Sequence, residues 1–349
     1  MDAALITPDG TRRPGDAASV RQLLSAKSPF WLDLHGGKET APFLREVFGF
    51  HPLAVEDAEQ FGQRPKVDDY GDYVLLILYG APATGHNGLV EVHCFYSEQY
   101  LVTVHHTPCP ELEAMLDRLG QAPSSDTSLI MLLHGILDSL VDSFFPLLAD
   151  FDDDIDDLED SILVKPTQEQ LGRLFTMKRS LISVRKVITP MRDAQATLVT
   201  GVNTLPGMTR EAERYFRDVY DHLIRISDLL DSYRDLLSGA LDTHLSTVSN
   251  RMNVVIKQLT IVATLFLPLT FLTGFFGQNF GFLVANIQGL AAFLVFGLGL
   301  EILAPVCLLL WIWHSGWLSG DSAAVPRGLP ANGANGKRRR ARLPQVRTT

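Results

Sequence analysis

The residues with the clearest chemical potential form an acidic run near the middle of the chain. Eight carboxylates occur among the eleven residues from Asp150 to Asp160. Carboxylate oxygens are hard ligands of the kind that Mg²⁺ prefers. Like charges crowded into one segment repel each other, so a bound cation would relieve that repulsion. The run therefore favours a metal-binding surface, and a solvated acidic face is the alternative.

A second polar group, Gly277-Gln278-Asn279, lies inside a long apolar region. No Asp, Glu, Lys or Arg occurs from Gln258 to Leu300, a run of 43 residues. About 20 apolar residues suffice for a helix to cross a bilayer, so we expect two spans, at 256–276 and 290–313. The first would be about 31 Å long at ~1.5 Å per residue. A buried hairpin is the alternative, but a soluble core rarely needs so long a segment without charge.

The charged residues that flank these spans predict the orientation of the protein in the membrane. Arg251 precedes the first span, Lys257 lies in its first turn, and seven basic residues and one acid follow the second, from Asp321 onward. Basic flanks mark the cytoplasmic side, so both termini are expected there. The net charge is −10 for the whole chain and −16 for residues 1–320. This argues against a nucleic-acid-binding protein, whereas the basic tail could contact anionic lipids.

The region before the spans is expected to contain an α/β part followed by a helical part. Short apolar runs predict strands at 30–34, 73–78, 90–96 and 100–105, the last two paired as a hairpin, and a helix at 41–48. After residue 128 the apolar side chains recur at steps of three and four, and the acids of the acidic run fill the other helix faces. Pro166 is expected to open the next helix, and Pro190 to end or bend it.

The longest predicted element is a helix that leads into the first span. Apolar residues recur at steps of three or four from Phe216 to Leu259, a spacing typical of a coiled-coil seam. Nothing in the sequence breaks this pattern, so we expect one helix from about Thr209 to Phe276, roughly 100 Å long. Such a seam must be covered, either by the acidic helix or by neighbouring copies of the chain.

Four segments make the chain resemble the CorA-type magnesium transporters over nearly its whole length. They are His51–Asp57 (HPLAVED), Gln63–Val67 (QRPKV), Tyr215–His222 (YFRDVYDH) and Leu259–Phe271 (LTIVATLFLPLTF). The resemblance implies an α+β membrane protein that assembles as a homopentamer, with an N-terminal cytoplasmic α/β domain. It implies a long stalk helix that continues as the first, pore-lining span, with the second span outside it. It also implies transport of hydrated Mg²⁺, often with Co²⁺ or Ni²⁺, and a pore closed by intracellular Mg²⁺.

The resemblance also implies a selectivity filter at the outer mouth of the pore. In the family a Gly-Met-Asn signature holds the hydrated ion through neutral oxygens. The matching residues here are Gly277, Gln278 and Asn279, so Gln replaces Met. The loop that follows usually carries a Glu in the family, but residues 281–287 contain no carboxylate. These departures concern ion selectivity; we expect Mg²⁺, and Zn²⁺ or another divalent cation is the alternative.

One face of the first span is mixed apolar and small, as expected for a narrow and partly hydrophobic conduit. The expected pore-lining residues are Asn253, Ile256, Thr260, Ala263, Leu267, Thr270 and Gly274. Pro268 cannot donate a backbone hydrogen bond to the Thr264 carbonyl, which could then face water in the pore. Close packing of helices through small residues is the alternative for any single position.

A regulatory metal site in the cytoplasm is the second site that the resemblance implies. Asp218 matches, through the Tyr215–His222 segment, the family position of one Mg²⁺ ligand. Four carboxylates of the acidic helix can face it, namely Asp152, Asp153, Asp156 and Asp157. The other family ligand follows the strand at 73–78, where the nearest match is Thr84 and Glu91 lies further on. We therefore expect this inter-subunit site to be weakened or rebuilt.

Two further groups have open interpretations. Glu301 lies within the second span, where a charged carboxylate costs at least ~2.5 kcal/mol. It is either a proton or cation site, or a neutral carboxyl paired within the helix. A zinc site is conceivable from the imidazole and thiol groups, but no Cys-x-x-Cys spacing supports one. These groups are His93, Cys94, His105, His106 and Cys109.

No nucleophile elbow, zincin motif or phosphate loop is present in the sequence, so we expect neither an enzyme nor an organic cofactor. We expect a homopentameric Mg²⁺ transporter in a cell membrane, with divalent ions, lipids and its own copies as partners and no nucleic acid. The expected domains are 1–127 (cytoplasmic α/β), 128–250 (acidic helices and stalk), 251–318 (two-helix pore) and 319–349 (basic disordered cytoplasmic tail). A Zn²⁺ transporter on the same scaffold and a non-conducting, membrane-anchored metal sensor are the alternatives.

Overall fold

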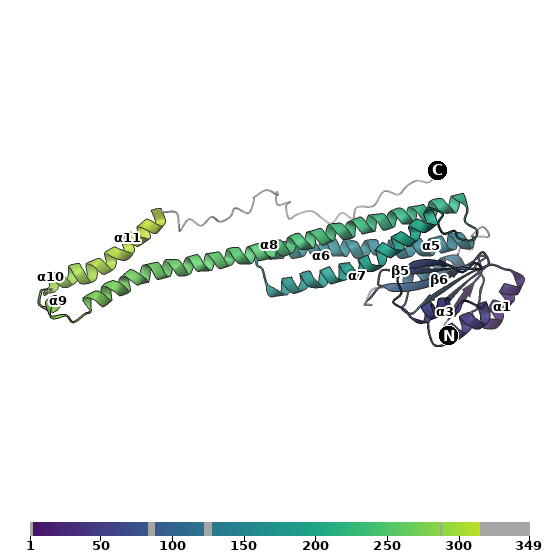
Figure 1. The fold of residues 1–349 in the computed structure, drawn as a ribbon, viewed down its shortest axis with the longest axis horizontal. Coiled ribbons are helices and arrows are strands. Elements are labelled where there is room, and N and C mark those ends of the chain that lie inside the picture. The colour runs from purple at the N-terminus through teal and green to yellow at the C-terminus, as the bar shows by residue number, and fades with distance from the viewer. Residues whose placement is uncertain (1–2, 83–87, 122–127, 287, 315–349) are drawn as a thin grey trace. The chain divides into compact units, whose positions relative to one another are not determined.

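The computed structural model describes residues 3–82, 88–121, 128–286 and 288–314 (Figure 1). Two compact units divide the chain, Met1–Ser249 and Asn250–Thr349. The first unit contains a mixed sheet with its helices, and the second contains short and long apolar helices. The predicted basic tail at 319–349 and the loop residue Thr84 lie outside the described residues.

A seven-stranded sheet forms the centre of the first unit. Its order is β2-β1-β3-β7-β6-β5-β4, with β3 and β7 parallel and every other neighbouring pair antiparallel. The strands are β1 (Ala3–Ile6), β2 (Arg12–Pro14), β3 (Phe30–His35), β4 (Lys66–Asp69), β5 (Val74–Gly80), β6 (Val90–Tyr96) and β7 (Tyr100–His105). The predicted strands and the β6–β7 hairpin are confirmed. Strands β1, β2 and β4 were not predicted; they are short and have exposed or half-buried residues.

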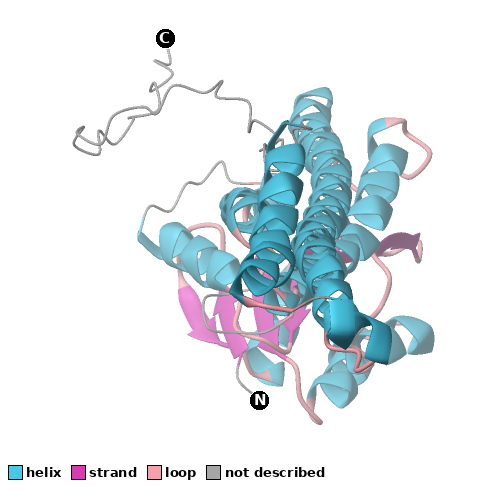
Figure 2. Cartoon of the chain, turned by 90° about the vertical axis from the view of Figure 1, so that its left-hand side faces the viewer, coloured by secondary structure: helices cyan, strands magenta, loops and turns pink. Residues whose placement is uncertain are grey.

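The central strands are buried on both faces because helices pack against each side of the sheet (Figure 2). The short elements α1 (Ala17–Ala26), α2 (Thr40–Phe43), the π-helical segment η1 (Leu44–Phe48) and α3 (Pro52–Glu59) lie among the strands in the chain. Helix α4 (Pro110–Gln121) follows β7, and α5 (Leu129–Asp142) contacts β5. All seven residues of β5 are buried, which explains its continuous apolar sequence.

Three long helices run alongside one another in the first unit (Figure 1). They are α6 (Phe144–Val164), α7 (Gln168–Val199) and the part of α8 (Arg210–Phe276) that belongs to this unit. Thr167 begins α7 with a reciprocal capping box to Gln170, so the helix starts next to Pro166 as predicted. Pro190 was predicted to end or bend this helix. It does not end the helix, because α7 continues through Pro190 to Val199.

Helix α8 is continuous over 67 residues, and its buried residues follow the predicted seam from Phe216 to Leu237. The prediction continued with Leu241 and Leu245, but the structure buries Ala240 and His244 instead. The buried residues are Ala212, Phe216, Val219, Leu223, Ile226, Leu230, Tyr233, Leu237, Ala240 and His244. Beyond His244 the apolar repeat continues, but its side chains are exposed in the single chain; Leu259, for example, is 68% exposed. The same helix therefore has a covered part and an uncovered part.

The second unit contains the end of α8 and a second apolar helical stretch. The turn after α8 leads to α9 (Gly281–Asn286), and Leu290–His314 then forms α10 (Leu290–Ala292), the π-helical segment η2 (Phe293–Gly299) and α11 (Leu300–His314). Three helical segments are long and apolar enough to cross a membrane: Leu129–Val164, Arg210–Phe276 and Leu290–His314. Half of the most apolar stretch of the first segment is buried, whereas the most apolar stretches of the other two segments have no buried residues. The two predicted spans thus correspond to the two uncovered segments.

Candidate ion pathway and metal cluster

The predicted pore-lining residues all lie on the uncovered part of α8. Asn253, Ile256, Thr260, Ala263, Leu267, Thr270 and Gly274 are exposed in the single chain. Leu267 is 72% exposed, which is a large exposure for an apolar side chain in a folded protein. This face needs a partner surface, either lipid or further copies of the chain.

The threonine hydroxyls of this helix are already used as donors. Thr260 donates to the Ile256 carbonyl and Thr270 to the Phe266 carbonyl, both at 2.8 Å. Thr264 likewise donates to the Thr260 carbonyl. A hydroxyl has one proton and two lone pairs, so these side chains present acceptor oxygens to their surroundings. Such oxygens suit the hydrogens of water around a cation better than they suit an anion.

The predicted filter residues form the turn that ends α8. The Gly277 amide donates to the Thr273 carbonyl at 2.9 Å, and the Gln278 amide donates to the Phe275 carbonyl at 3.3 Å. A Cβ on Gly277 would lie 2.9 Å from the same Thr273 carbonyl oxygen, so this position favours glycine for a steric reason. Asn279 follows the turn with an exposed side chain. The glycine of the predicted filter thus has a structural role in ending the helix at this point.

A cavity of about 300 Å³ adjoins this turn. Gln278 and Asn279 provide its only side-chain amides, and the remaining walls are apolar or glycine. These walls come from Phe276, Leu283, Val284, Gly289, Ala292, Phe293, Phe296 and Gly297. No carboxylate lines this cavity among the described residues, as the sequence of the loop predicted.

Three metal-ligating groups meet between α5 and α8 in the first unit. The His222 Nδ1 atom lies 3.1 Å from an oxygen of Asp142 and 4.0 Å from an oxygen of Asp138. The Nε2 atom of the same ring lies 3.9 Å from an oxygen of Asp218. Among the described residues, Asp138, Asp142 and His222 form the one group whose ligand atoms all lie within 4.8 Å of one another. We name these three residues the α5–α8 cluster.

Local packing explains why α5 carries its two carboxylates to this place. A Cβ on Gly80 would lie 2.9 Å from the Leu140 side chain, so glycine lets α5 approach β5 closely. The Ser143 hydroxyl accepts a hydrogen bond from the Ala81 amide at 2.8 Å and donates one to the Leu140 carbonyl. The C-terminal end of α5 is therefore fixed against the sheet at the turn where Asp138 and Asp142 point towards α8.

The electrostatics of the α5–α8 cluster favour a cation. Burial raises the pKa of Asp138 above its usual value, and the nearby charge of Asp142 raises it further. Burial also lowers the pKa of His134, which lies one turn before Asp138. Both shifts indicate that this surface accommodates additional negative charge poorly and neutral imidazole well. A divalent cation would offset the carboxylate repulsion.

The predicted acidic-helix ligands do not join Asp218 within one chain. Asp152, Asp153, Asp156 and Asp157 are exposed on α6, while Ile155 and Leu158 face the core. The Phe151 ring contacts the Tyr233 ring at 6.0 Å, and Tyr233 lies four turns beyond Asp218 on α8. Apolar periodicity predicts which face of α6 is buried, but it does not determine the register of α6 along α8. The partners that the structure gives Asp218 come instead from α5 and from its own helix.

Glu91 is occupied by structural hydrogen bonds. Its carboxylate accepts hydrogen bonds from the Gly62 and Gln63 amides at 2.5 and 3.0 Å, and the His93 Nε2 atom lies 2.8 Å away. Burial alone would raise the pKa of Glu91, but the hydrogen bonds from His93 and Gly62 lower it below its usual value. Glu91 therefore fixes the loop before β4 and does not replace the family ligand.

The imidazole and thiol groups considered for zinc are dispersed. His105 Nε2 lies 3.3 Å from an Asp33 oxygen, whereas His93 pairs with Glu91. Cys94 and Cys109 are buried, and burial raises the pKa of both thiols. They do not form a cluster of three ligands within the described residues.

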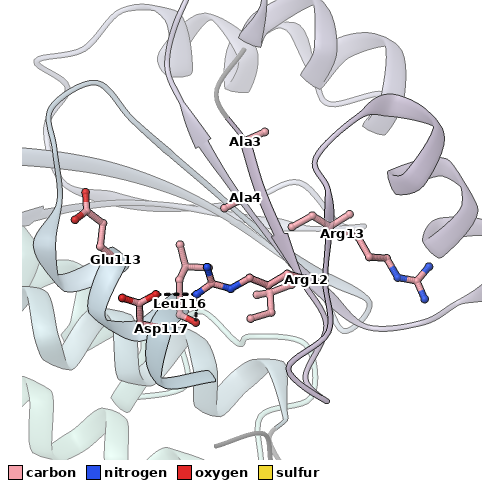
Figure 3. Close-up of a pocket in the computed structure, with 9 residues that line it drawn as sticks. Ala3, Ala4, Arg12, Arg13, Glu113, Leu116 and Asp117 are labelled. Carbon is pink, nitrogen blue, oxygen red and sulfur yellow. Dashed lines mark hydrogen bonds and ion pairs between the residues drawn. The ribbon is translucent and has the colours of Figure 1, made fainter. Parts of the chain in front are cut away.

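A cleft of about 490 Å³ lies between α4 and strands β1 and β2 (Figure 3). The Arg12 guanidinium donates to an Asp117 oxygen at 2.7 Å and to the Leu116 carbonyl at 3.3 Å. Both ionic side chains are mostly exposed, so the pair contributes little to stability. It attaches the N-terminal hairpin to α4 and offers no convergent set of metal ligands.

Comparison with known proteins gives a consistent result over most of the chain. Residues 26–314 match the model of the family described as CorA-like Mg²⁺ transporter proteins. The cobalt/magnesium transport protein CorA of Thermotoga maritima is 36% identical over 280 residues, which cover 77% of this chain and 78% of that protein. The zinc transport protein ZntB of Yersinia pseudotuberculosis is 26% identical over 306 residues, 86% of this chain and 92% of that protein.

A solved structure also resembles this fold. The complete structure of the CorA magnesium transporter from Methanocaldococcus jannaschii superposes with a TM-score of 0.74 at 22% sequence identity. The match covers 83% of this chain and 91% of that one. At this level of identity the likeness shows the shared fold, including the long helix and the C-terminal apolar helices.

Proposed function

Because the chain belongs to the family of CorA-like Mg²⁺ transporters, whose members are membrane transporters of divalent metal ions and not enzymes, we propose that it is a channel-like conduit for hydrated Mg²⁺. Co²⁺ and Ni²⁺ are further proposed cargo. The proposed direction is into the cytoplasm, down the membrane potential.

The observation that carries this proposal is the uncovered part of α8. It is charge-free from Gln258 onward, it presents an exposed small and apolar face, and it ends at the turn that contains Asn279. A ring of such helices would form a narrow conduit with apolar constrictions at Ile256 and Leu267. The second apolar stretch, Leu290–His314, would lie outside this ring.

A homopentamer is the proposed assembly. The side chains of the apolar repeat of α8 are exposed past His244, so neighbouring copies or lipids have to cover them. We propose that both termini and the first unit lie in the cytoplasm. The proposed division remains 1–127, 128–250, 251–318 and 319–349 for the α/β domain, the acidic helices with the stalk, the pore domain and the tail.

Selectivity is assigned to Gly277, Gln278 and Asn279. Mg²⁺ loses its hydration shell reluctantly, so a filter can hold the hydrated ion by hydrogen bonds from its water to neutral amide oxygens. Asn279 offers such an oxygen at the end of α8, and Gln278 offers a second one in place of a thioether. The two amides beside the cavity at this turn support this assignment.

Regulation is assigned to carboxylates of the first unit. Asp218 lies beside the α5–α8 cluster, and a divalent ion bound there would hold α5 and α8 together. The exposed acids Asp152, Asp153, Asp156 and Asp157 would provide cation-attracting surface that a neighbouring subunit can meet. Intracellular Mg²⁺ bound to these carboxylates is proposed to favour the closed conduit.

Zn²⁺ is the second candidate cargo, and four observations favour it. Gln278 replaces the family's Met, and the loop that follows has no carboxylate to attract Mg²⁺. The imidazole of His222 in the α5–α8 cluster also suits Zn²⁺ better than Mg²⁺. Relatives named zinc transport proteins share 26% identity with this chain.

Ion flux into proteoliposomes tests the proposal and separates the two cargoes. The full chain is reconstituted, and uptake of Mg²⁺, Co²⁺ and Zn²⁺ is followed with internal indicator dyes under a negative internal potential. We expect Mg²⁺ uptake, with Co²⁺ competing. Zn²⁺ uptake without Mg²⁺ uptake would establish the second candidate, and no uptake of any ion would contradict transport by this scaffold.

A further inference from the structure

The side-chain amides of the predicted filter are not held by hydrogen bonds in the part of the chain that the structure describes. Gln278 and Asn279 are both exposed, and neither side chain bonds to another described residue. The backbone of Asn279 likewise forms no hydrogen bond there, since the bonds of this turn are made by the Gly277 and Gln278 amides. The direction in which the two side chains point is therefore set by how the turn packs.

The packing of the turn depends on Phe276, the last residue of α8. Its half-buried side chain lines the cavity of about 300 Å³ beside the turn. The centroid of its ring lies 6.3 Å from that of Phe296, with an angle of 33° between the planes, a separation at which aromatic pairs attract each other. Among the described residues this is the one ring contact between α8 and the second apolar stretch, Leu290–His314. Phe296 thus holds the residue to which the predicted filter is directly bonded.

The local sequence of the second stretch explains why Phe296 reaches this place. It lies in the π-helical segment η2, and such segments occur frequently at functional sites. A Cβ on Gly299 would lie 3.1 Å from the Leu294 carbonyl oxygen, so the winding of η2 favours glycine at its end. Within η2, Phe293 and Phe296 both line the cavity beside the turn. The segment therefore presents two rings to the end of α8.

We propose that Phe296 is a positioning residue of the filter. Its ring fixes Phe276 and thereby directs the amides of Gln278 and Asn279 towards a hydrated cation. Groups that are already oriented lose less conformational entropy when they bind, so the fixed turn binds the cation more tightly than a mobile one. Phe296 does not touch the ion. This role rests on the proposed function, and it makes the second apolar stretch a determinant of ion binding although that stretch lies outside the proposed conduit.

A spin label in the turn tests the positioning without any transport. Cys307, the exposed cysteine, is replaced by Ser, and Phe280→Cys, at a position that is 65% exposed, is labelled with a nitroxide in the full-length protein in lipid. We expect Phe296→Ala to raise the mobility of the label, because the ring that holds the end of α8 is removed. Equal spectra with and without Phe296→Ala would overturn the proposal, whatever the protein transports.

Leu298→Ala is the matched control for this measurement. The Leu298 side chain is 45% exposed and that of Phe296 is 46% exposed, and both belong to η2. Leu298 does not line the cavity beside the turn. Leu298→Ala should therefore leave the spectrum unchanged, and the same rise in mobility in both variants would overturn a specific role of Phe296.

Uptake kinetics test the consequence for the ion. Phe296→Ala should raise the KM for Mg²⁺ by about two- to tenfold, the range that one aromatic contact provides, with little change in the maximal rate per assembled protein. A merely structural defect would lower the maximal rate and leave the KM unchanged. Phe296→Tyr keeps the ring and should keep the wild-type KM. Phe296→Leu removes the ring but retains an apolar side chain, so it should raise the KM as alanine does and serves where the alanine variant does not assemble. An unchanged KM in the variants without the ring would overturn the positioning role.

A double-mutant cycle tests whether Phe296 acts through Phe276. If the effect passes through their contact, Phe276→Leu combined with Phe296→Leu should raise the KM no further than the more affected single variant, because residues in contact are not additive. Increases that multiply would overturn action through Phe276.

Two outcomes separate this role from the proposed function. Normal flux in wild type, with an equal KM and equal spectra in Phe296→Ala, would overturn the positioning and leave the proposed function intact. No flux in wild type, together with a label that becomes mobile in Phe296→Ala, would contradict the proposed function and retain the positioning of the turn.

Discussion

The two parts of α8 carry the same apolar repeat but differ in what covers it. Up to His244 the seam is buried within its own chain. From Leu245 to the end of the helix the apolar side chains are exposed or half-buried, and many are exposed by more than half. The repeat alone therefore does not distinguish a helix of a soluble core from one that lines a conduit. The distinction comes from charge, because the covered part alternates with acids and bases and the uncovered part has none after Lys257.

The largest expected effect is on stability in the covered part. Phe216 is fully buried, and Phe216→Ala should lower the free energy of unfolding by about 3–5 kcal/mol, since it removes core contacts and leaves a cavity. Thermal unfolding of the detergent-solubilised protein measures this. Leu267→Ala is the matched change in the uncovered part and should alter flux with little loss of stability. Equal destabilisation by both would remove the distinction between the two parts.

The next effect concerns the turn that ends the uncovered part. Asn279→Ala removes the proposed filter amide and should reduce Mg²⁺ flux by roughly tenfold or more, because a hydrogen bond to a charged group contributes ~1.5–3 kcal/mol. Proteoliposome uptake measures the change, with assembly checked by size-exclusion chromatography. Asn286→Ala alters a nearby amide that bonds to the Phe282 carbonyl, and we expect it to keep wild-type flux. Loss of flux in both variants would mean that the loop as a whole, not Asn279, is required.

A smaller effect is expected from the metal cluster of the covered part. Mg²⁺ or Co²⁺ should raise the melting temperature of the wild-type protein, because an ion that binds the folded state stabilises it. Asp142→Asn removes one ligand, and tenfold weaker binding would reduce the stabilisation by about 1.4 kcal/mol. Asp153→Asn removes an exposed acid of α6 and serves as the matched control. Identical melting curves with and without the ions would exclude a site at the α5–α8 cluster.

The smallest effect is the pH dependence of stability in the first unit without metal. Burial alone would lower the pKa of His105, but the hydrogen bond and charge of Asp33 raise it above its usual value. The stabilisation is therefore fully present below the unfolded value of about 6.5 and is lost as the pH rises through the folded value. Asp33→Asn should weaken this dependence in melting curves between pH 6 and 8. A melting temperature that rises with pH over this range in wild type alone would contradict the assignment.

The sequence predicted those features that depend on local patterns. Apolar runs located β3, β5, β6 and β7, the charge-free run located the two uncovered helices, and the steps of three and four predicted the buried face of α8. Short strands such as β2, with three exposed residues, leave no such pattern. The end of a helix predicted at Pro190 is wrong, because α7 continues through this residue and tertiary packing outweighs the missing hydrogen bond.

The metal cluster could be predicted only in part. The motif match indicated Asp218, whereas Asp138 and Asp142 gave no signal beyond their spacing of four on a helix. Their role depends on the close approach of α5 to β5 at Gly80 and on the register of α5 against α8, which are tertiary features. The acids of α6 were predicted as ligands because they are dense in the sequence. They lie along a part of α8 beyond Asp218, near Tyr233. The predicted filter and pore positions remain predictions for the flux experiments.

Cysteine accessibility during flux tests the central claim most directly, namely that the uncovered face of α8 lines the ion pathway. Cys307, the exposed native cysteine, is first replaced by Ser, because Cys94 and Cys109 are buried. Leu267→Cys is then introduced on α8 and, as its control, Leu303→Cys on the exposed face of α11. A charged, membrane-impermeant thiol reagent should block Mg²⁺ uptake through Leu267→Cys and leave Leu303→Cys active. Uptake through labelled Leu267→Cys at the unlabelled rate would contradict the account.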